Sequence, residues 1–211
     1  MPPLILYFIV TGAISIVAAF TLNQKLKKNL KSLFKDKNSK DLGILGMNAS
    51  GKTVFLSFLQ GKEYIEKPTE NEDKYEKFIY KSNSGRIFKI SKGVDITGKN
   101  YKRIKYDSIM QDSNVIFYFF NINLYLNDVN YLRECNSRFQ SVYQNVLKNN
   151  KQLILFASHI DLIDKGTNYI DEFERRIDNK PYNSIRDLLH PINLKDKIEL
   201  KKLVDQIFEN K

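Results

Sequence analysis

The sequence predicts an α/β domain with a mainly parallel six-stranded sheet, preceded by one transmembrane helix. Two apolar runs, VIFYFF at 115–120 and LILFA at 153–157, have the length and composition of strands that are buried on both faces. Helical periodicity flanks both runs, and such strands are typical of parallel sheets covered by helices on both sides. A third run, at 4–22, carries no charge over 19 residues, which predicts the transmembrane helix.

The elements of the domain are expected between residues 41 and 209. The expected strands cover residues 41–45, 75–81, 86–91, 114–121, 152–157 and 188–193. The expected helices cover residues 51–60, 100–111, 127–148, 168–178 and 196–209. The second and third strands would form a hairpin, and residues 61–73 a polar loop. Because the carboxyl ends of parallel strands meet at one edge of a sheet, the loops after residues 45, 91, 157 and 188–193 should lie together.

The composition of the 211-residue chain fits a globular domain with a basic amino-terminal segment. Hydrophobic residues make up 42% and charged residues 27%, which argues against a disordered chain. Residues 1–40 contribute +6 of the net charge of +10, so the basic side chains are not spread over a nucleic-acid-binding face, and no nucleic-acid partner is expected. The single cysteine, Cys135, excludes an intrachain disulfide and a zinc cluster.

Residues 1–22 are expected to be an uncleaved membrane anchor. A helix of 19 residues spans about 28 Å, close to the hydrocarbon thickness of a bilayer. A buried helix and a cleaved signal peptide are the alternatives, but no basic residue precedes the run, and the run is long for a signal peptide. The seven lysines of residues 1–40 all follow the run, so the positive-inside rule places the N-terminus outside and the rest of the chain in the cytosol.

Residues 23–40 form a basic segment between the anchor and the domain at 41–211. Apolar residues recur every fourth position from Leu22 to Phe34, as on one side of a helix that lies along an anionic lipid surface. A solvated basic linker fits the same pattern equally well. In the anchor, small residues at positions 11, 15 and 19 have a spacing that permits helix pairing, which is weak support for a homodimer.

Residues 46–53, GMNASGKT, fit the phosphate-binding pattern G-x-x-x-x-G-K-[ST] between an expected strand and an expected helix. The glycines let the backbone curl so that N–H groups face a phosphate, and the helix that follows adds its positive N-terminus. Lys52 would reach the β- and γ-phosphates, and the Thr53 hydroxyl would bind Mg²⁺. The expected nucleotide-binding residues of this loop are Gly46, Asn48, Ala49, Ser50, Gly51, Lys52 and Thr53.

Two further segments follow expected strands at the same edge. In Asp95-Ile96-Thr97-Gly98, the carboxylate can hold Mg²⁺, usually through water, and the Gly98 N–H can contact a γ-phosphate. In Ser158-His159-Ile160-Asp161, Asp161 can accept both the ring N–H and the exocyclic amine of guanine, a donor pair that adenine lacks. An ordinary strand-end loop with a helix cap is the alternative for the second segment.

These three segments, in this order, resemble the small GTPases, and most closely the Arf family, whose phosphate loop reads Gly-x-Asp-Ala-Ala-Gly-Lys-Thr. The stretch SIMQDSNVIFYFFNIN at 108–123 and the pattern Phe156-Ala157-x-x-x-Asp161-Leu162 also resemble that family. The resemblance covers residues 41–211. With an anchor in front, the layout is similar to that of the β subunits of the signal-recognition-particle receptor.

The resemblance implies a Ras-like G domain with a P-loop that binds GTP or GDP and Mg²⁺. Thr53, Thr69 and Asp95 would be the metal ligands, and Lys52 and Thr69 the catalytic residues. Further nucleotide contacts would come from Gly98 and from the base-binding loops, at Ser158, His159, Asp161, Asn193 and Leu194.

Three departures from the family pattern change what is expected. Lys99 stands where a glutamine orients the attacking water, and a lysine cannot accept a hydrogen bond, so intrinsic hydrolysis should be slow. Ser158-His159 stands in place of Asn-Lys, which should weaken guanine selectivity. Asn48 replaces an aspartate of nearly the same shape, with a small expected effect.

The expected function is a membrane-anchored, nucleotide-dependent switch that recruits a cytosolic protein partner, with weak or partner-dependent GTP hydrolysis. A non-hydrolysing, nucleotide-bound membrane scaffold is the second expectation, which Lys99 favours. A P-loop kinase or ATPase is the third, and the D-x-x-G segment and Asp161 argue against it.

Overall fold

The computed structural model describes residues 40–62, 73–75, 77–81, 87–90, 93–95 and 103–208. The expected anchor at 1–22 and the basic segment up to residue 39 lie outside these residues. Within the described part of the chain, no helix is both long and apolar enough to cross a bilayer.

A six-stranded, mostly parallel sheet forms the centre of the fold, as the sequence predicts. Its strands lie in the order β3 (Phe78–Lys81), β4 (Ile87–Ile90), β1 (Lys40–Gly46), β6 (Val115–Asn121), β7 (Gln152–Ser158) and β8 (Leu189–Pro191). Neighbouring strands are parallel except β3 and β4, which form the expected antiparallel pair at one edge. The carboxyl ends of the five parallel strands therefore meet on one side of the sheet.

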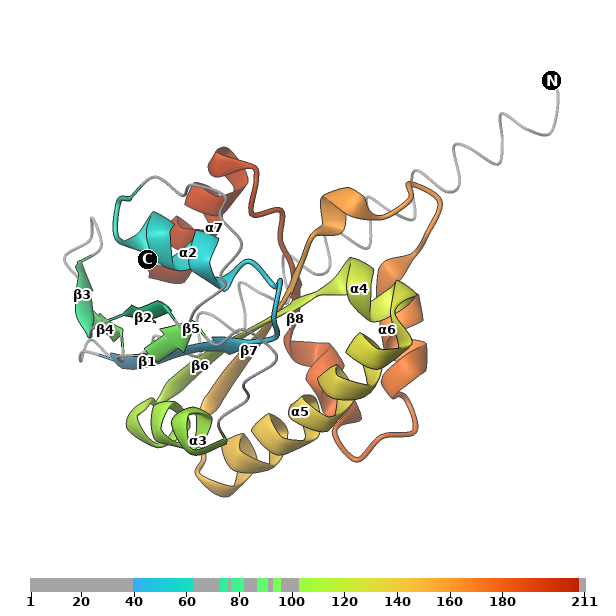
Figure 1. The fold of residues 1–211 in the computed structure, drawn as a ribbon, viewed down its shortest axis with the longest axis horizontal. Coiled ribbons are helices and arrows are strands. Elements are labelled where there is room, and N and C mark those ends of the chain that lie inside the picture. The colour runs from blue at the N-terminus through green and yellow to red at the C-terminus, as the bar shows by residue number, and fades with distance from the viewer. Residues whose placement is uncertain are drawn as a thin grey trace, which may run out of the picture.

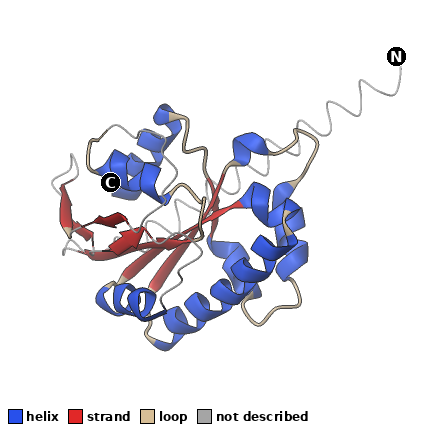
Figure 2. Ribbon diagram, in the orientation of Figure 1, coloured by secondary structure: helices blue, strands red, loops and turns tan. Residues whose placement is uncertain are grey.

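Helices cover both faces of this sheet (Figures 1 and 2). On one face lie α2 (Lys52–Leu59) and α7 (Lys197–Phe208). On the other lie α3 (Arg103–Asp112), α4 (Ile122–Asn127), α5 (Val129–Lys148) and α6 (Tyr169–Ile177). The helices expected at 51–60, 100–111, 168–178 and 196–209 are confirmed, with ends shifted by one to three residues.

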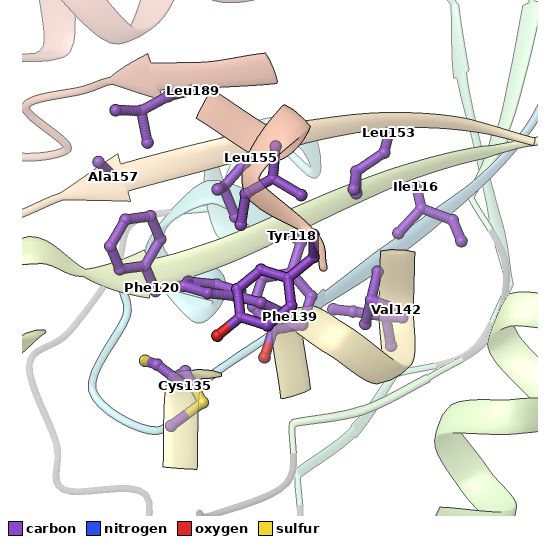
Figure 3. Close-up of a cluster of buried hydrophobic side chains, with 14 of the residues drawn as sticks. Ile116, Tyr118, Phe120, Cys135, Phe139, Val142, Leu153, Leu155, Ala157 and Leu189 are labelled. Carbon is purple, nitrogen blue, oxygen red and sulfur yellow. The ribbon is translucent and has the colours of Figure 1, made fainter. Parts of the chain in front are cut away.

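Strand β6 is buried along its whole length because it supplies both cores. Phe117 and Phe119 face α2 and α7, whereas Tyr118 and Phe120 face α5 and α6, as the alternation of a strand requires. Figure 3 shows the second core, in which Phe120 packs edge-on against Phe139 of α5 with ring centroids 5.2 Å apart. The buried thiol of Cys135 lies in this core, and burial raises its pKa, which fits a structural side chain.

The helix expected at 127–148 is confirmed as α5, with its start at Val129, and a short helix that was not expected, α4, directly precedes it. The Asn121 side chain accepts a hydrogen bond from the N–H of Leu124 at 3.0 Å and caps α4. Asp128 then accepts from the N–H groups of Asn130 at 2.8 Å and Tyr131 at 3.0 Å and caps α5. An Asn or Asp cap offers the backbone a new helix start, and two caps seven residues apart divide the segment.

The structure also corrects the expected strand at 75–81. Tyr75 belongs to a separate strand, β2 (Asp73–Tyr75), which pairs antiparallel with β5 (Gly93–Asp95). The hairpin strand begins only at Phe78. Asp95 therefore ends β5 rather than following the hairpin directly. Such short strands carry too few residues for a periodic signal.

His190 of β8 is buried with no hydrogen-bond partner for Nε2 among the described residues. Its ring stacks on Phe156 of the neighbouring strand, with centroids 5.9 Å apart. Burial lowers the pKa of His190 from 6.5 to about 4, so the ring is neutral in the folded protein at pH 7.

We expect this histidine to make the fold sensitive to acid. The unfolded chain takes up the proton near pH 6.5 and the folded chain only near pH 4, so stability is lost as the pH falls through this window. The loss from this group is about 3 kcal/mol between pH 7 and pH 4. Urea unfolding of wild type and His190→Phe at both pH values measures it. An equal loss in both proteins would contradict the prediction.

Candidate functional site

The candidate site lies at the carboxyl ends of the two adjacent strands β1 and β6. After β1 the chain turns into α2 on one face of the sheet, and after β6 it turns into α4 on the other (Figure 1). Chains that leave neighbouring parallel strands in opposite directions open a crevice between them, where α/β proteins bind ligands. The loop that carries GMNASGKT starts at this point.

The first residues of the loop run directly along the end of β6. The N–H of Met47 donates to the carbonyl oxygen of Phe119 at 2.8 Å. A Cβ atom on Gly46 would lie 2.2 Å from the same oxygen, so only glycine allows this approach. The hydroxyl of Tyr106 on α3 donates to the Gly46 carbonyl and accepts from the Gly46 N–H at 3.3 Å. The entry to the loop is therefore fixed from two sides.

The lysine of the loop is folded into the loop itself. Lys52 is only 6% exposed, and its ammonium group donates to the Met47 carbonyl at 2.6 Å and to the Ser50 hydroxyl at 3.4 Å. The Ser50 hydroxyl donates in turn to the Met47 carbonyl at 2.7 Å. A positive charge is thus held among the loop's own backbone atoms, where a bound phosphate would meet it.

Helix α2 begins at this loop with a terminus suited to an anion. Its N-cap, Gly51, has φ +76° and provides no side-chain cap, and the first turn contains no acidic residue. At the start of a helix, the first N–H groups have no carbonyl partner within the helix, and the helix dipole has its positive end there. Both features favour a negatively charged ligand. Thr53 lies half-buried in this first turn.

Two loops from the far part of the chain meet the phosphate loop at Gly51. A Cβ atom on Gly51 would lie 2.2 Å from Cδ1 of Leu194 and 4.0 Å from Cε1 of His159. Leu194 follows β8 and His159 follows β7. The structure therefore brings together the phosphate loop and the two loops that the sequence indicates for the base.

The segment after β7 is held by an inward-facing serine. Ser158 is fully buried, and its hydroxyl donates to the Phe120 carbonyl at 3.0 Å. The same oxygen lies 2.8 Å from Nδ1 of His159, so the histidine donates and its proton sits on Nδ1. Burial lowers the pKa of His159, which keeps the ring neutral and leaves Nε2 as an acceptor.

Asp161 and Lys195 join the loops after β7 and β8 through an ion pair. Nζ of Lys195 lies 3.2 Å from Oδ2 of Asp161, with the lysine side chain 69% and the aspartate side chain 22% exposed. Asn193 shapes the second loop by accepting from the Lys195 N–H at 3.0 Å. Such a partly exposed pair contributes at most about 1 kcal/mol, so a ligand can replace the lysine at little cost.

The remaining predicted residues are not brought into the site by described atoms. Thr69, Gly98 and Lys99 lie outside the described residues. Asp95 is described by its backbone alone, as the last residue of β5. The metal-binding roles of Thr69 and Asp95 stay predictions.

Three side chains that were not among the expected site residues hold the phosphate loop: Tyr106, Asn121 and Tyr131. Asn121 alone has a local signal, because an asparagine at the end of a buried strand and three residues before a helical N–H is a capping pattern. The two tyrosines reach the loop from α3 and α5, and nothing in their local sequence indicates this.

The fold and the site together define a mixed α/β protein whose glycine-rich loop joins a central parallel strand to a helix, an arrangement compatible with a P-loop domain. The chain matches no family model, and no curated protein sequence matches it. A functional assignment therefore depends on the residues of this chain and their geometry.

Proposed function

We propose that this protein is an Arf-like GTP-binding protein, held in a membrane by its first 22 residues, that recruits a cytosolic protein partner in one nucleotide state. The observation that supports this most is the approach of Leu194 and His159 to Gly51, where an added Cβ atom would lie 2.2 Å and 4.0 Å from their side chains. It joins a loop suited to phosphates with two loops suited to a base, so one nucleotide could span both.

The phosphate half would be bound by residues 46–53. Lys52 would exchange its contacts with Met47 and Ser50 for the β- and γ-phosphates, a short displacement for a long side chain. The start of α2 would add backbone N–H groups. Thr53, with Thr69 and Asp95 as further expected ligands, would hold Mg²⁺, which neutralises phosphate charge when bound.

The base half would be bound by Asp161, with the ring of His159 and the side chain of Leu194 beside it. A guanine can give two hydrogen bonds to one carboxylate, whereas adenine presents an acceptor where guanine has its ring N–H. The base would displace Lys195 from Asp161, and the exposed lysine would regain solvent. Ser158 would act indirectly, because its hydroxyl is committed to Phe120 and orients His159.

The nucleotide that copurifies with the full chain tests this proposal. After gentle purification, the protein is denatured and the released nucleotide is identified by chromatography and mass spectrometry. We expect GDP or GTP in near-stoichiometric amount, and excess ATP should fail to compete with labelled GDP. Asp161→Ala should lose this discrimination, whereas the matched change Asp164→Ala should keep it. ATP in the wild-type protein, or no nucleotide, would overturn the proposal.

A scaffold that binds GTP without cleaving it is the second candidate, because Lys99 replaces the glutamine that orients water in the family. We expect Lys99→Gln to raise the single-turnover rate of GTP hydrolysis at least tenfold, since glutamine can both accept from and donate to the attacking water. Lys102→Gln removes a similar charge three residues away and should leave the rate unchanged. An unaltered rate in Lys99→Gln would favour the scaffold.

A further inference from the structure

The tip of the phosphate loop is exposed and has an unusual backbone conformation. Asn48 and Ala49 are both solvent-exposed. Ala49 has φ +51°, in the left-handed region that alanine rarely adopts. Such a residue persists only where its surroundings hold it, so contacts to the tip are needed to explain its shape.

Tyr131, near the start of α5, provides the first of these contacts. Its hydroxyl accepts from the N–H of Asn121 at 2.9 Å and donates to the carbonyl of Asn48 at 3.2 Å. One oxygen thus connects the end of β6 with the loop tip. Burial raises the pKa of Tyr131 well above its ordinary value, so the hydroxyl keeps the proton that it donates.

Asn121, the last residue of β6, provides the second contact. Its Nδ2 donates to the carbonyl of Ala49 at 3.2 Å, while its Oδ1 accepts from the Leu124 N–H at 3.0 Å. The amide therefore uses one end to hold the loop and the other to cap α4. A cap requires only the oxygen, so the Nδ2 contact is a separate role.

These two bonds also set the direction of the loop's N–H groups. The C=O and N–H of a trans peptide unit point in opposite directions. With the Ala49 carbonyl held toward Asn121, the N–H of Ser50 points away from Asn121. We infer that Asn121 and Tyr131 are positioning residues that hold the tip in its phosphate-binding form and so control how long a nucleotide stays bound. This inference rests on the proposed function, although the order of the loop can be measured without a nucleotide.

Two pairs of matched variants of the full chain test the inference. Tyr131→Phe removes one hydroxyl, and its control is Tyr182→Phe, in a buried tyrosine that packs on Phe139. Asn121→Ser keeps a capping oxygen but loses Nδ2, and its control is Asn168→Ser, at the cap of α6. The measurements are the dissociation rate of a fluorescent GDP, amide hydrogen exchange of residues 46–53, and the free energy of unfolding.

We expect Tyr131→Phe and Asn121→Ser each to release GDP about fivefold faster, the effect of one lost hydrogen bond. Amide hydrogen exchange at residues 46–53 should accelerate in both variants. The two controls should show neither faster GDP release nor faster exchange, even at a comparable loss of stability. Exchange and dissociation rates equal to those of the controls would overturn the inference. If the wild-type chain binds no GDP, the proposed function fails, and the exchange of residues 46–53 alone decides whether these residues order the loop.

Discussion

Lys52→Ala is expected to weaken the binding of GTP and GDP about 100-fold, the value of a charge-assisted contact to phosphate in a partly closed site. The ammonium group is buried among loop atoms and carries the one full positive charge that the described part of the loop places there. Fluorescence titration of wild type and variant with labelled GDP measures the change.

Lys62→Ala is the matched control for this experiment. Lys62 is exposed and lies just beyond the carboxyl end of α2. Its substitution removes the same charge and side-chain length as Lys52→Ala. Its affinity for GDP should equal that of wild type. Because Lys52 also bonds the Met47 carbonyl, the free energy of unfolding has to be measured in parallel. Lys52→Ala protein that is folded and binds GDP normally would exclude the proposed phosphate site.

Gly46→Ala is expected to destabilise the fold by about 3 kcal/mol, a large part of the stability of an ordinary domain. The new Cβ atom would lie 2.2 Å from the oxygen and 2.8 Å from the nitrogen of Phe119. Both are backbone atoms of a fully buried central strand, so neither can move aside as a side chain would. Urea unfolding monitored by circular dichroism gives the loss.

Gly61→Ala separates the clash from backbone strain. Gly46 has φ +153° and Gly61 has φ +65°, so both positions are strained for alanine, but a Cβ atom on Gly61 would meet no heavy atom of the described residues within 4 Å. Its substitution should therefore cost only about 1 kcal/mol, for the left-handed conformation. Equal losses at the two glycines would show that the approach to Phe119 is not what requires Gly46.

The central sheet could be predicted because its signal is local. The apolar run at 115–120 fills both cores, so every residue is hydrophobic and no alternation is needed. The short pair β2–β5 could not be predicted, since three residues on each strand are too few to show an alternating pattern. The short helix α4 was not predicted, since its six residues are too few for a periodic signal, although Asn121 at its start is a recognisable capping residue.

The strand–loop–helix arrangement around residues 46–53 could be predicted for a similar reason, because the glycine-rich pattern has fixed spacings within eight residues. Its supports could not, since Tyr106 and Tyr131 contact it from positions 60 and 83 residues further along the chain. Hydroxyl groups that bond to backbone carbonyls require no sequence motif around them. The inward orientation of the Ser158 side chain likewise depends on its hydrogen bond to the Phe120 carbonyl of the neighbouring strand.

The contact of Gly51 with Leu194 has a consequence for how a newly made chain matures. A ribosome synthesises the phosphate loop early and residues 193–195 late, and in the sheet order β6 and β7 lie between β1 and β8, which precedes those residues. Pairings between such distant residues form slowly, because a long loop must close first. Under the proposed function, binding of guanine nucleotide would then distinguish nascent molecules whose last strand is in place from partly folded ones.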